Sequence, residues 1–154
     1  MRKYGFILCL LLIPLFLSGM GERPGSIAPA KLSTDKDVYA AGEKVTLTIS
    51  FTNTGTGDIS SYFPSAQKFD FIVMGPDKKE IWRWSAGKMF TMAIQPFALE
   101  VGKSVSFSAS WDQKDLQLKQ VAPGRYFIRG YIKLAQGLSS SGKEITINEA
   151  DKVQ

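Results

Sequence analysis

The feature that most constrains the fold is a strict alternation of apolar and polar residues in short runs. In residues 44–53, apolar side chains occupy every second position, and threonine or serine occupies most of the others. The same alternation returns in residues 103–111, where serines separate valine, phenylalanine, alanine and tryptophan. Successive side chains of a strand point to opposite faces of its sheet. This period therefore predicts strands with one buried face.

Turns rich in glycine, proline or small polar residues separate these runs at intervals of about eight to twelve residues. Further strands are expected at residues 32–39, 59–63, 69–75, 80–85, 125–134 and 143–148, with a short pairing at residues 91–93. Gln95 and Pro96 are expected to interrupt the chain, and only residues 112–120 have a short helical pattern. Seven or eight short strands with almost no helix predict an all-β, antiparallel β-sandwich, with a barrel as the alternative.

The first 21 residues have the pattern of a secretory signal peptide: a basic start, an apolar stretch over residues 5–17, and small residues after it. The alternative is an uncleaved membrane anchor, although the stretch is shorter than the ~20 residues that span a bilayer. We therefore expect an exported chain, secreted or associated with the cell envelope. The predicted division is a leader (1–21), a linker (22–31), one β-sandwich domain (32–148) and a tail (149–154).

Composition excludes several kinds of site. The chain has no histidine, and its one cysteine, Cys9, lies inside the predicted leader. The domain therefore cannot hold a Ser-His-Asp triad, a histidine metal site or a disulfide framework. Removal of the leader lowers the formal net charge from +5 to +3, because Arg2 and Lys3 leave with it. Such a charge does not indicate binding to nucleic acid or to an anionic membrane, and we expect membrane contact only through an uncleaved leader.

Two short motifs resemble catalytic sites without fitting them, and the acidic residues form no such pattern. Residues 85–88 match S-x-x-K, but they follow a predicted strand and lack the companion motifs. Residues 102–104 match the end of a phosphate-binding loop, but Phe97 stands where the upstream glycine is required. The acidic residues are dispersed (Asp70, Glu100, Asp112 and Asp115). We predict a protein that is not an enzyme and has no metal or cofactor.

All three tryptophans lie in residues 67–112. Alternation directs Trp82, Trp84 and Trp111 inward, so we expect them in the core. The alternative is an exposed tryptophan pair beside Arg83 that binds a carbohydrate or a protein. The loop that follows is unusually apolar, with Met89, Phe90, Met92, Ile94 and Phe97. These side chains either pack under the sandwich or contact a partner, and we expect packing.

The order of residues in this block resembles the BsuPI-type intracellular proteinase inhibitor domain of bacilli. The resemblance extends over about residues 35–135. Its signature consists of Phe69, Asp70, Phe71, Trp82, Arg83, Trp84 and Trp111. The resemblance implies an immunoglobulin-like β-sandwich and, in the founding members, inhibition of an intracellular subtilisin-type serine protease. The predicted leader departs from this pattern, because it would direct the chain away from such a target.

From this resemblance we predict a proteinaceous protease inhibitor that binds its partner, a serine protease, through surface loops. The candidate binding residues are Ser85, Lys88, Met89, Phe90 and Thr91, of which Lys88, Met89 and Phe90 would be offered to specificity pockets. The loops at residues 54–58 and 136–142 are expected beside them. The alternative is a cell-envelope interaction module that binds a protein or polysaccharide and has no protease target.

Overall fold

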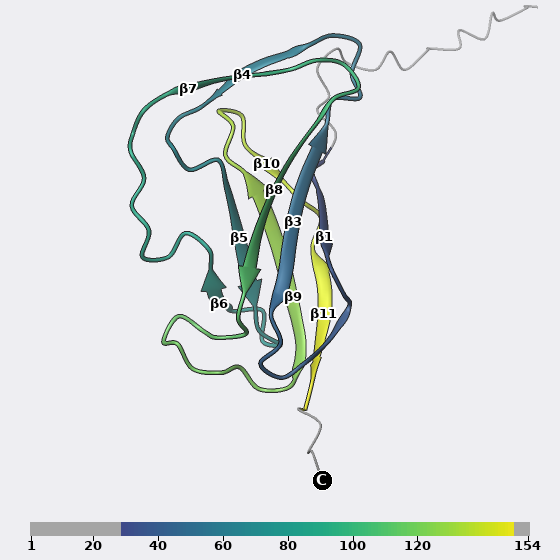
Figure 1. The fold of residues 1–154 in the computed structure, drawn as a ribbon, viewed down its shortest axis with the longest axis vertical. Coiled ribbons are helices and arrows are strands. Elements are labelled where there is room, and N and C mark those ends of the chain that lie inside the picture. The colour runs from purple at the N-terminus through teal and green to yellow at the C-terminus, as the bar shows by residue number, and fades with distance from the viewer. Residues whose placement is uncertain (1–28, 150–154) are drawn as a thin grey trace, which may run out of the picture.

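The computed structural model describes residues 29–149, which form two β-sheets and a small strand pair (Figure 1). The strands are β1 (Lys31–Thr34), β2 (Val38–Ala40), β3 (Val45–Thr52), β4 (Ile59–Phe63), β5 (Phe69–Met74), β6 (Glu80–Arg83), β7 (Gln95–Leu99), β8 (Ser104–Trp111), β9 (Gly124–Ile132), β10 (Leu138–Ser139) and β11 (Lys143–Asn148). Within these residues there is no helix of a length and apolarity that would cross a membrane.

The two sheets have the connectivity of an immunoglobulin-like sandwich. One has the order β1-β3-β8; the other has the order β2-β11-β9-β5-β6, with β10 on β9; β4 pairs with β7. The first strands serve both sheets, since β1 pairs antiparallel with β3 and β2 runs parallel to β11. Near the start of β9, the Tyr126 hydroxyl donates a 2.5 Å hydrogen bond to the Ala122 carbonyl, the tyrosine corner of such sandwiches. The predicted all-β, immunoglobulin-like sandwich is confirmed.

Local predictions fail at three places. The expected first strand, residues 32–39, is two strands in different sheets, and Asp35 at the break accepts a hydrogen bond from the Thr46 amide. Residues 91–93 have no strand, whereas β7 begins at Gln95 and tolerates Pro96 because its sheet has only two strands. Residues 112–120 form turns instead of a helix, and Gln113 and Leu118 have positive φ angles of 57° and 62°. The described strands number eleven instead of seven or eight.

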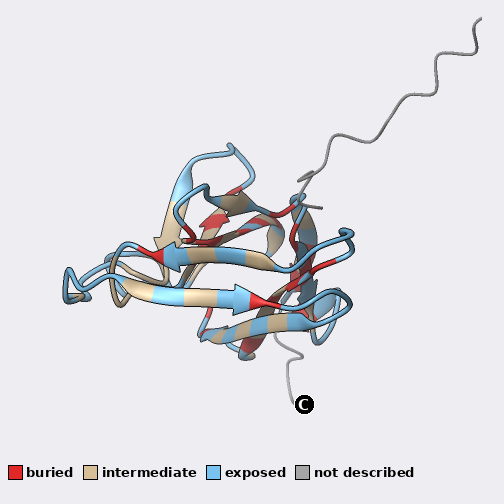
Figure 2. Cartoon of the chain, turned by 90° about the horizontal axis from the view of Figure 1, so that it is seen from above, coloured by how far each residue is buried: buried red, intermediate tan, exposed pale blue. Residues whose placement is uncertain are grey.

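The core lies between the two sheets (Figure 2). In β3 every second residue is buried, as alternation predicted. The sheets approach each other closely at Gly130 of β9, where a Cβ atom would lie 2.8 Å from Ile49 Cδ1. Trp111 is fully buried, and its Nε1 donates to the Lys114 carbonyl at 2.8 Å. The core prediction holds for Trp111, while Trp82 and Trp84 are half-buried against the core.

The described residues cover only part of the predicted division into leader, linker, domain and tail. The predicted leader lies outside the described residues, as do most of the linker and nearly all of the tail. Ala30, the second-last residue of the predicted linker, is buried and forms a β-bridge with Ser140. The packed structure therefore includes at least this residue before β1.

Candidate functional site

The candidate site is the connection between β6 and β7, residues 84–94, called the 84–94 segment below. In Figure 1 it runs along the outside of the sandwich from β6 to the β4–β7 pair. Its first residue continues the pairing of β6, because the Trp84 amide donates to the Phe71 carbonyl of β5 at 3.0 Å. A tight turn follows, with Gly87 at a φ of 70°, and residues 88–94 have no regular structure.

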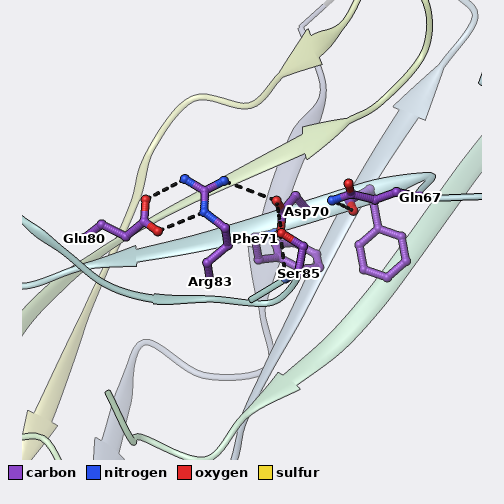
Figure 3. Close-up of polar contacts among 7 residues, drawn as sticks. Gln67, Asp70, Phe71, Glu80, Arg83 and Ser85 are labelled. Atoms are coloured by element: carbon purple, nitrogen blue, oxygen red, sulfur yellow. Dashed lines mark hydrogen bonds and ion pairs between the residues drawn. The ribbon is translucent and has the colours of Figure 1, made fainter. Parts of the chain in front are cut away.

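A buried carboxylate holds the start of the segment (Figure 3). Asp70 of β5 is 1% exposed. Its Oδ2 accepts from Ser85 Oγ at 2.7 Å and from Arg83 Nη1 at 3.2 Å. Its Oδ1 accepts from the amides of Ser85 at 3.1 Å and Phe71 at 3.0 Å. Four donors compensate the loss of hydration that burial of a carboxylate otherwise incurs.

Glu80 extends this network to the surface. Its two carboxylate oxygens accept from Arg83 Nε at 2.8 Å and Arg83 Nη2 at 2.5 Å. The hydrogen bond to Glu80 raises the pKa of Arg83 above its ordinary value, and the one to Asp70 adds to this, although partial burial acts in the opposite direction. Arg83 is therefore a permanent cation fixed between two carboxylates, and its fork geometry restrains the end of β6.

Aromatic contacts hold the same region from the other side. The Trp84 ring lies 4.2 Å from the Phe69 ring and 5.8 Å from the Phe90 ring, measured between centroids. Phe69 in turn stacks on Phe107 of β8 at 5.2 Å. The Lys88 ammonium lies 4.7 Å from the Trp84 centroid, within the range of a cation–π contact. Trp84 thus connects the core to the tip of the segment.

Beyond these contacts the segment is exposed and apolar. Met89 is 98% exposed, Met92 84% and Ile94 70%. The expectation that these side chains pack under the sandwich is wrong, because no layer of the described chain covers them. It holds in part for Phe90 and Phe97, which are half-buried. Exposed apolar side chains grouped on one segment are typical of a surface that contacts a partner.

The structure separates the five candidate residues by what they contact. Ser85 donates a hydrogen bond to Asp70. Lys88 and Phe90 lie against the Trp84 ring. The Thr91 carbonyl accepts from the Ala66 amide at 2.9 Å. The Met89 side chain is almost fully exposed to solvent. Of the signature residues, Asp70, Phe71 and Trp111 are buried and Phe69, Trp82, Arg83 and Trp84 are half-buried.

The two other predicted loops are tied to the β4–β7 pair. Asn53, which is 2% exposed, donates to the carbonyls of Gly57 and Leu99. Gln136 accepts from Ser61 Oγ of β4 at 2.7 Å. Sequence reasoning named Asp70 as part of the signature and among the dispersed acidic residues, and it missed the role of Asp70 in holding the 84–94 segment. The position of Asp70 between Phe69 and Phe71 could have indicated this role, because a buried carboxylate requires hydrogen-bond partners.

The remaining polar groups offer little chemistry. Glu100 and Asp112 are exposed, and the buried Asp70 is fully engaged. Residues 29–149 contain no cluster of three acidic or cysteine side chains that could hold a metal ion. A shallow groove of about 350 Å³ lies between the base of the segment and residues 112–118, with Trp82 and Leu118 in its lining.

The similar solved structures are distant. A β-glucosidase from Erythrobacter marinus has a TM-score of 0.46 at 14% identity, over 80% of this chain and 15% of its own. The sporulation control protein Spo0M from Bacillus subtilis has a TM-score of 0.45 at 18% identity, over 79% and 50%. The CARDB domain of a Pyrococcus furiosus protein has a TM-score of 0.44 at 10% identity, over 80% and 93%. No curated protein matches the chain.

A protein-family model provides the assignment. The model described as intracellular proteinase inhibitor, BsuPI, matches residues 32–137, which is more than half of the chain. This description corrects the prediction of an exported protein, secreted or envelope-associated, because it points to the inside of the cell. The chain therefore belongs to the BsuPI family of intracellular proteinase inhibitors.

Proposed function

We propose that the chain inhibits a serine protease by placing the 84–94 segment in the substrate cleft of the enzyme. The observation that carries the proposal is the exposure of Met89, 98%, on a segment whose base is fixed by a buried carboxylate. Membership of an inhibitor family supports a protease as the partner. The choice of a serine protease comes from the resemblance of the signature residues.

Met89 is the residue that we propose enters the specificity pocket. Its neighbours Lys88 and Phe90 turn back onto Trp84, so they support the tip instead of extending from it. A flexible thioether side chain fills irregular apolar pockets well. Ser85 and Thr91, bonded to Asp70 and Ala66, act as the two supports of the tip.

A fixed segment lowers the entropy that binding would otherwise cost. The chain has no disulfide to supply this rigidity, since its one cysteine lies outside the domain. The bonds from Ser85 to Asp70 and the ring contacts of Trp84 provide it instead. We propose that the chain acts by binding and not by catalysis. The Ser85 hydroxyl donates to a carboxylate and has no histidine to activate it.

The test is a titration of the full chain against subtilisin-type and chymotrypsin-type serine proteases, with a cysteine protease for comparison. We expect inhibition of at least one serine protease at micromolar concentration or below. Met89→Ala should weaken it about 30-fold, the size of an interface hot spot. The matched control Met92→Ala removes a similar exposed side chain from the same segment and should change inhibition less than about threefold.

Absence of inhibition across the panel would overturn the proposal. Inhibition of the cysteine protease alone would show that the serine target is wrong. If Met89→Ala and Met92→Ala lose the same amount of inhibition, Met89 has no special role. If Met92→Ala loses more, the main contact with the protease lies closer to β7.

A further inference from the structure

Strand β8 (Ser104–Trp111) forms the border of its sheet, and its outer edge is unpaired within residues 29–149 (Figure 1). It pairs with β3 over eight consecutive positions without a bulge. Long, regular edge strands are templates for pairing with another chain, and natural proteins usually protect them with lysine, proline, a bulge or a covering loop. β8 contains no charged residue and no proline.

The other border strand next to it in the molecule, β6, is protected. β6 has four residues, two of them charged, and its pairing with β5 contains a register shift. The Ile81 carbonyl on β6 also accepts a hydrogen bond from the Leu116 amide at 2.9 Å. The contrast shows that this fold can protect an edge, and that β8 has none of the same devices.

The backbone groups that point to the open edge belong to the serines. The Asn53 amide donates to the Lys103 carbonyl at 2.9 Å, so the carbonyl of residue 103 faces β3. Backbone groups alternate in direction along an antiparallel strand. The amides and carbonyls of Ser104, Ser106, Ser108 and Ser110 therefore point outward. The 2.9 Å contact of Ser108 Oγ with Thr48 Oγ1 agrees, because side chains are closer in pairs that lack backbone hydrogen bonds.

We propose that a second copy of this chain pairs with this edge, β8 against β8 in antiparallel orientation, about a two-fold axis at Phe107. The sequence around Phe107 is chemically palindromic: serine lies on each side, then valine or alanine, then serine again. A two-fold contact requires such self-complementarity. In this register Ser106 pairs with Ser108 of the second copy, and every outward amide and carbonyl of the four serines obtains a partner.

Both faces of the joined sheet suit this register. The outer face places serine against serine, so no like charges oppose each other across the axis. On the inner face, Val105, Phe107 and Ala109 are only half-buried in the single copy. The second copy places its own Val105, Phe107 and Ala109 beside them and covers them further. The two three-stranded sheets become one six-stranded sheet.

Sedimentation velocity of the full chain over a concentration series tests the proposal. We expect a dimer that dissociates on dilution. Ser106→Pro removes one outward amide and leaves the hydrogen bonds between β8 and β3 intact. Ser108→Lys places a positive charge on the open edge, where the same lysine of the second copy would lie nearby and repel it. Each should raise the dimer dissociation constant at least about tenfold. The control Thr48→Lys places the same charge on the same face, beside Ser108 but on the inner strand β3, and should leave the dimer intact.

Residue-resolved hydrogen exchange separates pairing at the edge from other association. The amides of the four serines should exchange slowly in the dimer and fast on dilution, while those of Val105, Phe107 and Ala109 stay slow throughout because they bond to β3. A monomer at about 100 µM would overturn the proposal. So would a dimer that Ser106→Pro and Ser108→Lys leave unchanged, as expected if other residues drive association. If the wild type is a monomer, and Ser108→Lys loses protease inhibition while Thr48→Lys keeps it, the edge receives a strand of the protease instead of a second copy.

Discussion

At the base of the 84–94 segment, the Ser85 amide and hydroxyl and the Arg83 guanidinium all donate to one buried carboxylate, whereas at the tip Met89, Met92 and Ile94 are exposed. The two regions are separated by only a few residues. Their difference shows how apolar side chains can stay exposed on a segment of fixed shape. Hydrogen bonds and ring contacts at the base hold the segment, so the tip does not need to pack against the core. The base is expected to carry stability and the tip to carry binding.

The largest effect is expected from Asp70→Asn. The amide keeps the shape of the carboxylate but replaces an accepting oxygen with a donor, which leaves Arg83 or Ser85 without an acceptor. Loss of a buried charged partner predicts a decrease of about 3 kcal/mol in the free energy of unfolding. Urea denaturation measures it. The control Asp112→Asn changes an exposed carboxylate 3.7 Å from Lys114 and should cost less than about 0.5 kcal/mol. Equal losses in both variants would contradict the special role of the base.

Trp84→Ala removes the ring that joins base and tip. Because Trp84 is half-buried, we expect a loss of about 2 kcal/mol, below the range for a fully buried aromatic ring. Amide hydrogen exchange of residues 88–91 should also become faster, since Lys88 and Phe90 lose their contacts. Unchanged exchange at the tip would show that the tip is held without Trp84.

Glu80→Gln weakens only the surface half of the network. The Glu80 side chain is 34% exposed, and exposed ion pairs contribute little, so the expected loss is about 0.5 kcal/mol. Denaturation beside Asp70→Asn provides the comparison. If Glu80→Gln and Asp70→Asn lower the free energy of unfolding by similar amounts, Asp70, Arg83 and Glu80 act as one unit. A double-mutant cycle between Glu80 and Asp70 would then measure their coupling.

The smallest effect on stability is expected from Met89→Ala. A side chain that is 98% exposed loses almost no contact on truncation, so the free energy of unfolding should change by less than about 0.5 kcal/mol. The same variant is expected to show the largest loss of inhibition in the protease titration. A clear decrease in stability would place Met89 with the base and would remove the division between the two regions.

Alternation in residues 44–53 and 103–111 was sufficient to predict β3 and β8, and the last strand, β11, has the predicted bounds. These elements follow from side-chain period alone. The split of residues 32–39 into β1 and β2 could not be predicted, because it depends on two different partners, β3 and β11. The candidate loop was found from its apolar composition, but composition could not show which of its residues are supports.

By itself, the sequence determined the all-β class, the single buried face of the alternating strands and the resemblance to the family, because these can be read from the order of residues along the chain. Tertiary structure decided which strands share a sheet, how Asp70 meets Ser85, and that Met89 stays outside while Phe90 packs on Trp84. These properties depend on contacts between segments far apart in the chain. Local period fixes the direction of a side chain relative to its own strand, and only the packed sandwich decides what covers it.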